Sequence, residues 1–385
     1  MIQKISTRDG YGKRLGELDD PRIVVLTGDL MESSRVKTFA EKYPERFIQV
    51  GISEQDMFGM ADGLGLENKI PLTNTFASFC LRGHEQIRVI AINKSNVKVV
   101  WHHSGISVGQ DGVTQMCEQD ISLFRTMPNF TVIVPCDALE AQKALDAIIK
   151  INGPCYLRLS REPSTVITNE YSDFKVGKAN ILKDGHDILI VACGLMVAEA
   201  LKAAKMLEDM GVDAAVMNMH TIKPIDKENL LKYAQRTHAV VTAEEHSIYG
   251  GLGSAVTEAL SLSKIPIKCL GIRDEFGESG KPEELFLKFG LTADNIVEYC
   301  NDVLRFKEKT NSLREVDDMM KDINVSDKTM KKEDTSHQTA RQTETKTSYD
   351  KDPRNRIVKM TPEQKKQMDD VLAKMFGGRK NGNGK

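Results

Sequence analysis

Gly51-Ile-Ser-Glu-Gln-Asp-Met-Phe-Gly-Met-Ala-Asp-Gly-Leu-Gly-Leu66 joins an extended apolar segment, 47–50, to a helix-like segment. Ser53 stands where a helix cap is expected, and Glu54 falls in the first turn. The glycines of the helix lower its propensity, so we expect another group to approach its backbone closely. A carboxylate at a strand-to-helix turn is typical of ligand sites in α/β proteins, although it also serves as a plain helix cap.

Strand-like and helix-like segments alternate on both sides of this stretch. Apolar runs of strand length occur at 23–26, 47–52, 70–75, 97–101, 131–135 and 155–159. After a polar connection at about 162–186 they return at 187–192, 214–217, 239–242 and 265–272. Continuous apolar strands separated by helices predict mostly parallel sheets covered on both faces. The predicted fold class is therefore α/β, with two doubly wound domains at 1–165 and 180–305.

The sequence changes character from about residue 310. Polar and charged residues dominate 311–359, which predicts a largely disordered, charged tail over 310–385. Within it, Thr361-Pro-Glu-Gln364 resembles a capping box and predicts a short amphipathic helix near 361–376. Five apolar residues on one face of that helix favour a docking element over an inert tail.

Composition excludes several classes of protein. No apolar run among the 385 residues approaches a membrane span, and the N-terminus has no signal-peptide shape. Seven cysteines without paired spacing indicate reduced thiols and a cytoplasmic location. Residues 301–385 hold 20 Lys and Arg against 15 Asp and Glu, whereas residues 1–300 hold 33 against 40, so neither part predicts a nucleic-acid-binding body.

Charged, polar and aromatic residues that suit ligand binding occur in loops after the predicted strands of the first domain. They belong to a series of short motifs along the chain. The motifs are Thr27-Gly-Asp-Leu30, Val50-Gly-Ile-Ser-Glu-Gln55, Asn74-Thr-Phe-Ala-Ser-Phe79, His103, Gly109-Gln-Asp-Gly112, Pro128-Asn129, Val134-Pro-Cys-Asp137, Leu159-Ser-Arg161 and Glu244-Glu-His246. In this order and spacing, residues 1–300 resemble the C-terminal half of a transketolase, its pyrimidine-binding domain followed by its C-terminal domain.

The resemblance implies thiamine diphosphate as cofactor. Glu54 matches the glutamate that bonds the aminopyrimidine ring and makes that ring an internal base, which gives Glu54 a catalytic role. Phe79 matches the aromatic residue that stacks on the pyrimidine, and Phe76 helps to form the same wall. Two phenylalanines after a strand are also typical of a core, and for Phe76 both interpretations stay open.

The resemblance also implies sugar phosphates as substrates, as in the pentose phosphate pathway. Arg8, Ser33 and Arg161 match phosphate-contact positions, and cationic and hydroxyl groups suit a dianion. His103 matches a catalytic histidine that contacts the sugar hydroxyls, and Asp111 a carboxylate that binds a donor hydroxyl. Arg8 and Ser33 remain open to a second interpretation, as a surface charge and a turn cap.

One position departs from the family pattern. Where transketolases usually carry Gly-x-Thr-His-Gln, this chain has Gly112-Val-Thr-Gln115-Met116, so Gln115 replaces a second active-site histidine. Glutamine hydrogen-bonds a substrate hydroxyl but relays no proton near neutral pH. The replacement predicts an altered substrate choice or a less efficient transfer.

The resemblance further implies a second polypeptide. Thiamine diphosphate enzymes hold the diphosphate through magnesium on a Gly-Asp-Gly followed by Asn, and no Gly-Asp-Gly occurs among the 385 residues. We therefore expect no metal ligand here, an N-terminal transketolase subunit as partner, and self-association in a two-plus-two assembly. The second domain then serves assembly, and its loop Tyr249-Gly-Gly-Leu-Gly253 is structural despite its likeness to a phosphate cradle.

These inferences make the chain the C-terminal subunit of a split transketolase that transfers a two-carbon ketol unit between sugar phosphates. Two alternatives remain. One is a beta-type subunit of a 2-oxo-acid dehydrogenase or a deoxyxylulose-phosphate synthase-like enzyme, which would need less sugar recognition. The other is a non-catalytic assembly subunit, which would have no use for Glu54, Phe79, His103 and Asp111.

Overall fold

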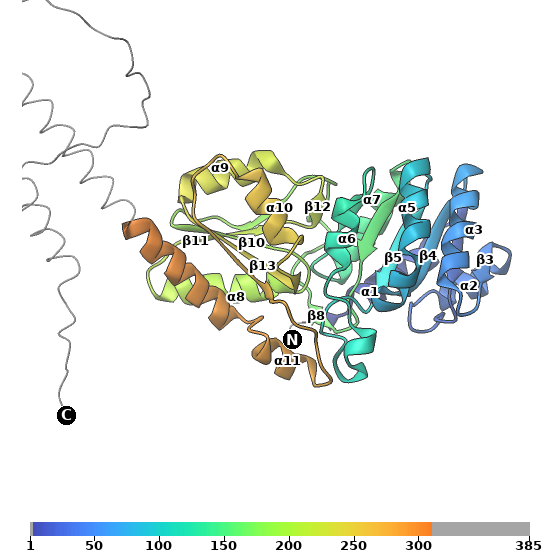
Figure 1. Cartoon of the computed structure of the whole chain (residues 1–385), viewed down its shortest axis with the longest axis horizontal. Helices are drawn as coiled ribbons and strands as arrows, with labels where there is room; N and C mark the ends of the chain where they lie inside the picture. The colour runs from blue at the N-terminus through green and yellow to red at the C-terminus, as the bar shows by residue number, and fades with distance from the viewer. Residues whose placement is uncertain (1–2, 310–385) are drawn as a thin grey trace, which may run out of the picture. The chain divides into compact units, whose positions relative to one another are not determined.

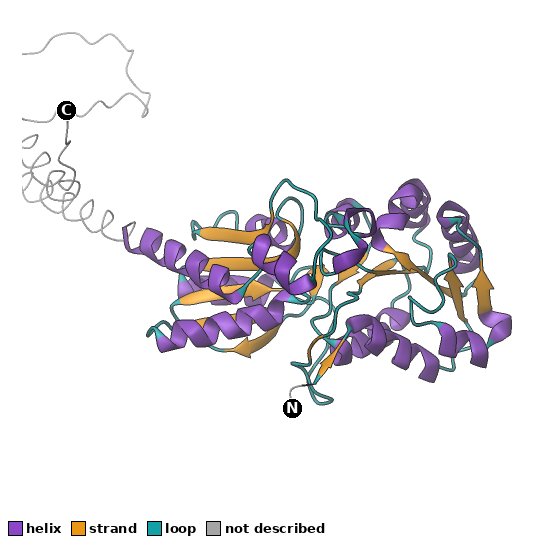
Figure 2. Ribbon diagram, turned by 90° about the horizontal axis from the view of Figure 1, so that it is seen from below, coloured by secondary structure: helices purple, strands orange, loops and turns teal. Residues whose placement is uncertain are grey.

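The computed structural model describes residues 3–309, which contain two main β-sheets with helices on both sides of each (Figures 1 and 2). The first sheet has the strand order β12-β6-β7-β5-β4-β2-β3, and all neighbours are parallel except β12 and β6. Its strands are β2 (Ile23–Thr27), β3 (Phe47–Gln49), β4 (Ile70–Phe76), β5 (Lys98–His102), β6 (Thr131–Ile133), β7 (Cys155–Arg158) and β12 (Thr221–Lys223). Every residue of β2, β4, β5 and β7 is buried, which explains why these strands are mainly apolar, although β4, β5 and β7 also bury polar residues near their ends.

Helices cover both faces of this sheet. One face carries α1 (Thr7–Glu17), α2 (Lys37–Lys42) and α7 (Ala138–Lys150), which share a core with β2, β4 and β7. The other carries α3 (Glu54–Leu66), α5 (His84–Asn93) and α6 (Asp120–Thr126). A short helix, α4 (Ala77–Cys80), follows β4 directly. This places the N-termini of several helices and loops beside the carboxyl ends of the strands.

The second sheet has the order β14-β13-β10-β11-β9, parallel except for the edge strand β9. Its strands are β9 (Asn180–Lys183), β10 (Ile188–Ala192), β11 (Ala214–Asn218), β13 (Val240–Ser247) and β14 (Ile267–Ile272). One face packs on α8 (Met196–Asp209) and on a helix over 293–309, and the other on α9 (Lys227–Thr237) and α10 (Leu252–Ala259). A last short helix is α11 (Pro282–Lys288).

The two sheets share packing. One hydrophobic cluster contains side chains of both, among them Val132 of β6 and Met217 of β11. Strand β12 lies between β11 and α9 in the chain, yet it pairs with β6 of the first sheet. Near the N-terminus, β1 (Lys4–Ile5) pairs with β8 (Ser164–Thr165) in a small antiparallel sheet, just before α1 begins.

The predicted α/β fold with two mostly parallel sheets is confirmed. Two local predictions are wrong. The connection over 162–186 contains β8 and β9, and the strand at 47–52 ends at Gln49, because the chain turns at Gly51 with φ +74°. The predicted tail over 310–385, with its helix near 361–376, lies outside the described residues.

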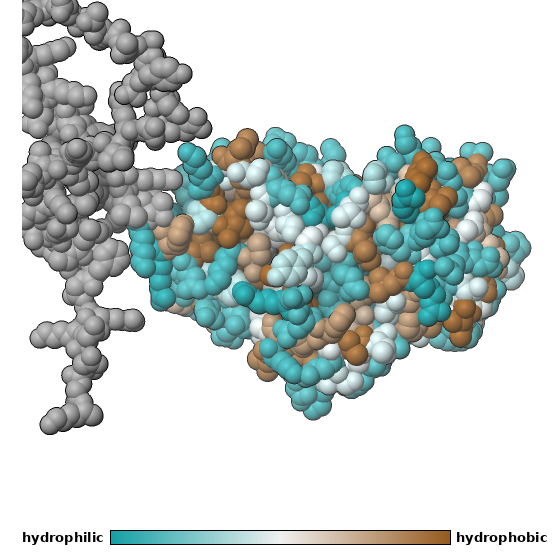
Figure 3. Space-filling view, in the orientation of Figure 1, coloured by the Kyte–Doolittle hydropathy of each residue, from teal (hydrophilic) through white to brown (hydrophobic). Residues whose placement is uncertain are grey.

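The helices, the surface and the cysteines of the described part each add one observation. Every helix within 3–309 is too short or too polar to cross a lipid bilayer. On the face drawn in Figure 3, hydrophilic side chains separate the apolar surface into small patches. All seven cysteines are free, and only Cys269 is partly exposed.

Candidate active site

The candidate residues come from the carboxyl ends of neighbouring parallel strands. Ser33 lies in the loop after β2, Phe79 in α4 after β4, and His103 directly after β5. Arg161 follows β7, which pairs with β5. Parallel α/β sheets bind ligands at this edge, because the loops that leave the strands meet there.

A pocket of about 430 Å³ lies at this edge. Seven of the nine residues predicted for the site line it, namely Arg8, Ser33, Phe76, Phe79, His103, Asp111 and Arg161. The other two, Glu54 and Gln115, do not. The structure thus brings together side chains that are as much as 153 positions apart in the sequence.

Arg8 contacts residues that follow two of the strands. Arg8 is in the first turn of α1, and its Nη1 donates to the carbonyl oxygen of Ser33 at 3.1 Å and to Nε2 of His103 at 3.3 Å. Its Nε is buried and has no hydrogen-bond partner among the described residues. A buried guanidinium nitrogen without a partner leaves one donor for a ligand.

Arg161 and Asp111 form a second polar group in the pocket. Arg161 Nη1 lies 3.0 Å from Oδ1 of Asp111 and donates to the carbonyl oxygen of Val108 at 2.6 Å. Asp111 belongs to the 3-10 turn Gly109–Asp111, which ends at Gly112 with φ +84°. The left-handed turn at Gly112 explains why the motif requires glycine at that place.

Aromatic rings form one wall of the pocket. The ring of Phe76 stacks on Phe79 with centroids 5.2 Å apart and on the imidazole of His103 with centroids 3.6 Å apart. Phe76 is 8% exposed, so it serves both the core and the wall. Such a wall provides a flat apolar surface for a planar ring.

The electrostatic environment keeps His103 neutral. Burial, followed by repulsion from the Arg8 guanidinium, lowers the pKa of His103 to about 2. Burial and the neighbouring Arg35 likewise lower the pKa of Arg8 to about 10. Since Arg8 donates to Nε2, the neutral ring carries its proton on Nδ1, which is buried and unpaired within residues 3–309. His103 therefore offers a hydrogen-bond donor and not an acidic imidazolium.

Glu54 is placed differently from the pocket residues. It is the first residue of α3 and only 1% exposed, and its Oε2 is buried without a hydrogen-bond partner among the described residues. The nearest cation is Arg82, whose Nη1 lies 3.5 Å away on a side chain that is 57% exposed. The predicted cap is wrong in one respect, because Ser53 occupies the cap position but its side chain makes no capping bond.

An unpaired buried carboxylate oxygen is costly unless a ligand bonds to it. Glu54 therefore fits a cofactor that presents a hydrogen-bonding group, and the wall of Phe76 and Phe79 fits a planar ring. Both features agree with an aminopyrimidine, the part of thiamine diphosphate that this half of a site would hold.

Gln115 lies outside the pocket. It ends the 3-10 turn Val113–Gln115 that follows Gly112, and its side chain is partly exposed. The turn that carries Gln115 contacts α4, which carries Phe79. The substrate contact expected for Gln115 stays a prediction.

The motif reasoning missed three pocket residues, Leu30, Glu32 and Arg35. All lie in the loop after β2 that also carries Ser33. Loops that follow parallel strands line such sites as whole segments, so the position of Ser33 already pointed to its neighbours as candidates.

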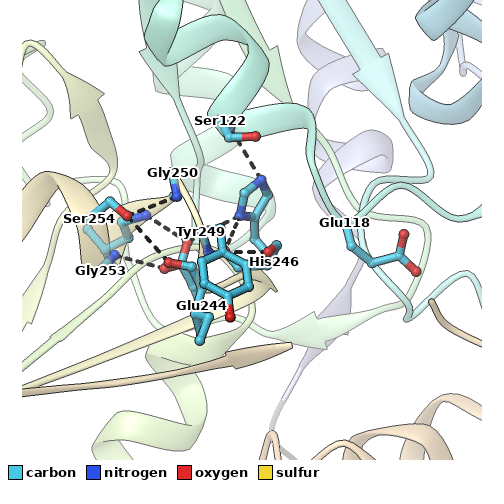
Figure 4. Close-up of polar contacts among 12 residues, drawn as sticks. Glu118, Ser122, Glu244, His246, Tyr249, Gly250, Gly253 and Ser254 are labelled. Carbon is cyan, nitrogen blue, oxygen red and sulfur yellow. Dashed lines mark hydrogen bonds and ion pairs between the residues drawn. The ribbon is translucent and has the colours of Figure 1, made fainter. Parts of the chain in front are cut away.

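The glycine loop of the second sheet holds an internal carboxylate (Figure 4). Glu244 accepts hydrogen bonds from the backbone nitrogens of Leu252 at 2.7 Å and Gly253 at 2.8 Å, the groups that would otherwise cradle a phosphate. A Cβ at Gly251 would lie 2.0 Å from Oε2 of Glu244, so glycine is needed for this approach. His246 accepts from the backbone nitrogen of Ser122 in α6 at 3.3 Å. These contacts give the loop a structural task.

Two protein-family models match the chain. Residues 3–165 match the transketolase pyrimidine-binding domain, and residues 177–296 match the transketolase C-terminal domain. Together the two models cover most of the chain and correspond to the two main sheets.

Among curated proteins, the chain is similar to a 6-deoxy-6-sulfo-D-fructose transketolase subunit of Clostridium sp. (strain MSTE9), with 43% identity over 305 residues. That match covers 78% of this chain and 95% of the relative. It is also 35% identical over 310 residues to one of the subunits of an apulose-4-phosphate transketolase of Phocaeicola vulgatus, covering 79% of this chain and 98% of the relative.

A solved structure described as a split gene transketolase, inactive beta4 tetramer, is 44% identical, with a TM-score of 0.73. The likeness covers 78% of this chain and 99% of that one. The family models, the curated relatives and this structure agree on one kind of protein. The chain therefore belongs to the transketolase family, in which it is a subunit of the split, two-subunit kind.

Proposed function

We propose that this chain supplies the pyrimidine-binding and sugar-phosphate-binding half of a thiamine diphosphate site and transfers a two-carbon ketol unit between sugar phosphates together with an N-terminal subunit. The observation that carries the proposal is the pocket in which seven residues of the family motifs meet. In this proposal residues 1–165 build the site, and residues 180–305 serve assembly.

Each side chain has a task in the proposed reaction. Glu54 holds a proton against the pyrimidine ring, and Phe76 and Phe79 keep water from that ring. Arg8, Ser33 and Arg161 bind the anionic end of the sugar, while His103 donates from Nδ1 and Asp111 accepts from hydroxyl groups. The cofactor, when bound, supplies the nucleophilic carbon of the reaction. The lowered pKa of His103, to about 2, suits hydrogen bonding and not acid catalysis at neutral pH.

The partner would hold the magnesium ion and the diphosphate. The helix α3 that begins with Glu54 supports an interface, because Gly59 and Gly63 have nothing within 4 Å of an added Cβ, and Ile52, Met60 and Leu66 expose between 41% and 74% of their surface. A related chain forms a tetramer described as inactive, so we expect the isolated chain to self-associate without activity.

A reconstitution tests the proposal. The purified chain is assayed alone and with a chain that carries Gly-Asp-Gly followed by Asn, sought first in a neighbouring reading frame, with thiamine diphosphate and magnesium present. We expect no turnover by the chain alone and turnover of ketose phosphates by the mixture. Turnover of pyruvate but of no ketose phosphate would instead favour a 2-oxo-acid dehydrogenase or deoxyxylulose-phosphate synthase-like enzyme, and inactivity of a stable complex would favour an assembly subunit.

A further inference from the structure

Arg35 lines the same pocket as Arg8 and Arg161, and no motif pointed to it. It lies in the loop after β2 with φ +58°, a left-handed conformation that is uncommon for a residue with a side chain. Its side chain is 41% exposed, so it stands at the mouth of the pocket and not in its floor.

The guanidinium of Arg35 is fixed by two contacts. Its Nε donates to Oδ1 of Asp9 at 2.6 Å, and its Nη1 donates to the carbonyl oxygen of Glu32 at 3.1 Å. Its Nη2 makes no hydrogen bond to any residue within 3–309. A guanidinium that is held on one side and free on the other is preorganised to bind an anion, because little rotamer entropy is lost on binding.

The loop that carries Arg35 is pressed against α1. A Cβ built at Gly12 would lie 2.4 Å from the Cβ of Arg35 and 2.5 Å from its carbonyl oxygen. Only glycine permits this approach. Since Arg8 lies one turn earlier in α1, the contact sets the position of Arg35 relative to Arg8.

Three cationic side chains therefore share one small space. Repulsion by Arg35 and by Arg161 contributes to the lowered pKa of Arg8, after burial as the largest cause. The acidic residues at the pocket, Asp111 and Glu32, balance only part of this charge, and Asp9 stands behind Arg35. An anion in the pocket relieves the repulsion, and a dianion relieves it more than a monoanion.

We infer that Arg35 is a specificity-determining residue that binds the anionic group at the far end of the ketose chain and favours a dianion, such as a phosphate, over a monoanion, such as a sulfonate. This inference rests on the proposed function. Its physical basis is that the Coulomb attraction of one cation to a dianion is twice its attraction to a monoanion at the same distance.

The test compares three donors that differ only at carbon 6: D-fructose 6-phosphate, 6-deoxy-6-sulfo-D-fructose and D-fructose, with the reconstituted complex. For Arg35→Met we expect kcat/KM to fall about 10-fold for the phosphate and about 3-fold for the sulfonate, mostly through KM, and to stay unchanged for D-fructose. The inhibition constant for inorganic phosphate should rise about 10-fold, which reports binding without turnover.

Two further variants sharpen the test. Arg22→Met removes the same charge at an exposed site outside the pocket, where Arg22 pairs with Asp20. It should leave kcat/KM unchanged for all three donors. Gly12→Ala should displace the loop that carries Arg35. Its loss in kcat/KM should again be largest for the phosphate, smaller for the sulfonate and smallest for D-fructose. An equal loss for all three donors, or none with Arg35→Met, would overturn the inference while the proposed function stands. A wild-type complex that turns over no ketose would remove the proposed function itself.

Discussion

At the scale of single residues, Glu54 is a buried acid whose only cation partner in the described part of the chain is the half-exposed Arg82. Its carboxylate is 1% exposed and starts α3, and one of its oxygens has no hydrogen-bond partner among the described residues. A protein bears such a cost where a ligand compensates for it. The residue therefore provides the sharpest test of the cofactor half-site.

We predict that Glu54→Gln lowers the turnover of the reconstituted complex by about 100- to 10,000-fold, because an amide holds no transferable proton against the pyrimidine ring. The thermal midpoint of the isolated chain should change little, since the amide fills the same space as the carboxyl group. The measurements are initial rates at saturating cofactor and thermal unfolding. Asp56→Asn is the matched control, because Asp56 is exposed in the same helical turn. Near-normal turnover of Glu54→Gln would contradict the assigned role.

At the scale of elements, α3 has two faces with different tasks. Met57, Phe58 and Ala61 pack into the core, whereas Gly59 and Gly63 lie on a face where an added Cβ meets nothing within 4 Å. Gly65 differs from these two, because its Cβ would lie 3.1 Å from the backbone nitrogen of Asn96. The first two glycines therefore have no packing contact among residues 3–309, and the proposed close approach by another chain would explain them.

We predict that Gly59→Trp leaves the isolated chain folded and prevents its assembly with the partner subunit, because the indole fills the space that the interface needs. Sedimentation of the mixed subunits, with activity as a second readout, measures the effect. Lys205→Trp, on the exposed face of α8, is the control for an added surface indole, since 66% of the Lys205 side chain is exposed. An active complex that contains Gly59→Trp would show that this face of α3 is free in the assembly.

The same elements show what could be predicted from the sequence. The central strands were recognisable because β2, β4, β5 and β10 are buried along their whole length and therefore contain runs of mainly apolar residues. β12 was not, because its three residues give no period and its partner β6 lies some 90 positions earlier. The place of Arg35 near Ser33 made it a candidate, but its position relative to Arg8 depends on the approach of Gly12, a contact between separate elements that no local pattern encodes.

At the scale of the whole molecule, the described residues contain the candidate site and the packing that keeps it in place. The pocket contains groups that suit a sugar and a planar ring. Outside the pocket, Oε2 of Glu54 accepts no hydrogen bond from any described residue. The second sheet shares a hydrophobic cluster with the first and contacts α6 through His246, so it supports the position of the first. Under the proposed function, we expect turnover only from the two-subunit complex, while the isolated chain stays folded.

The stability of the chain should depend on pH through buried histidines. Burial lowers the pKa of four of them, to about 3 for His102, about 2 for His103, about 4 for His220 and about 4 for His246. Unfolding returns these imidazoles to water, where their ordinary pKa is about 6.5. Below that pH the imidazoles are protonated in the unfolded chain but stay neutral in the folded chain. The histidines therefore lower the free energy of unfolding as the pH falls.

Buried glutamates act in the opposite direction, because burial also raises the pKa of Glu118, Glu140, Glu244 and Glu245. Burial raises the pKa of both Glu140 and Glu244 to about 7, so the folded chain retains two protons that the unfolded chain releases above its ordinary carboxyl pKa of about 4.3. Near pH 5.5 unfolding therefore takes up about four protons on histidines and releases about two from glutamates. Glu118 and Glu245 add to this release, so the net uptake is about two protons or fewer, and the free energy of unfolding falls by at most about 3 kcal/mol for each pH unit of acidification.

We predict that urea unfolding of the isolated chain at pH 6.5, 6.0, 5.5 and 5.0 shows this fall in the free energy of unfolding. His220→Gln should reduce the slope by about one proton, because it removes one of the four titrating rings, which stacks on Phe174 away from the pocket. Glu244→Gln should steepen the slope by about one proton, since it removes one of the opposing groups. A stability that rises as the pH falls from 6.5 to 5.0 would contradict the prediction, and an unchanged slope in His220→Gln would show that the ring of His220 is already protonated in the folded chain.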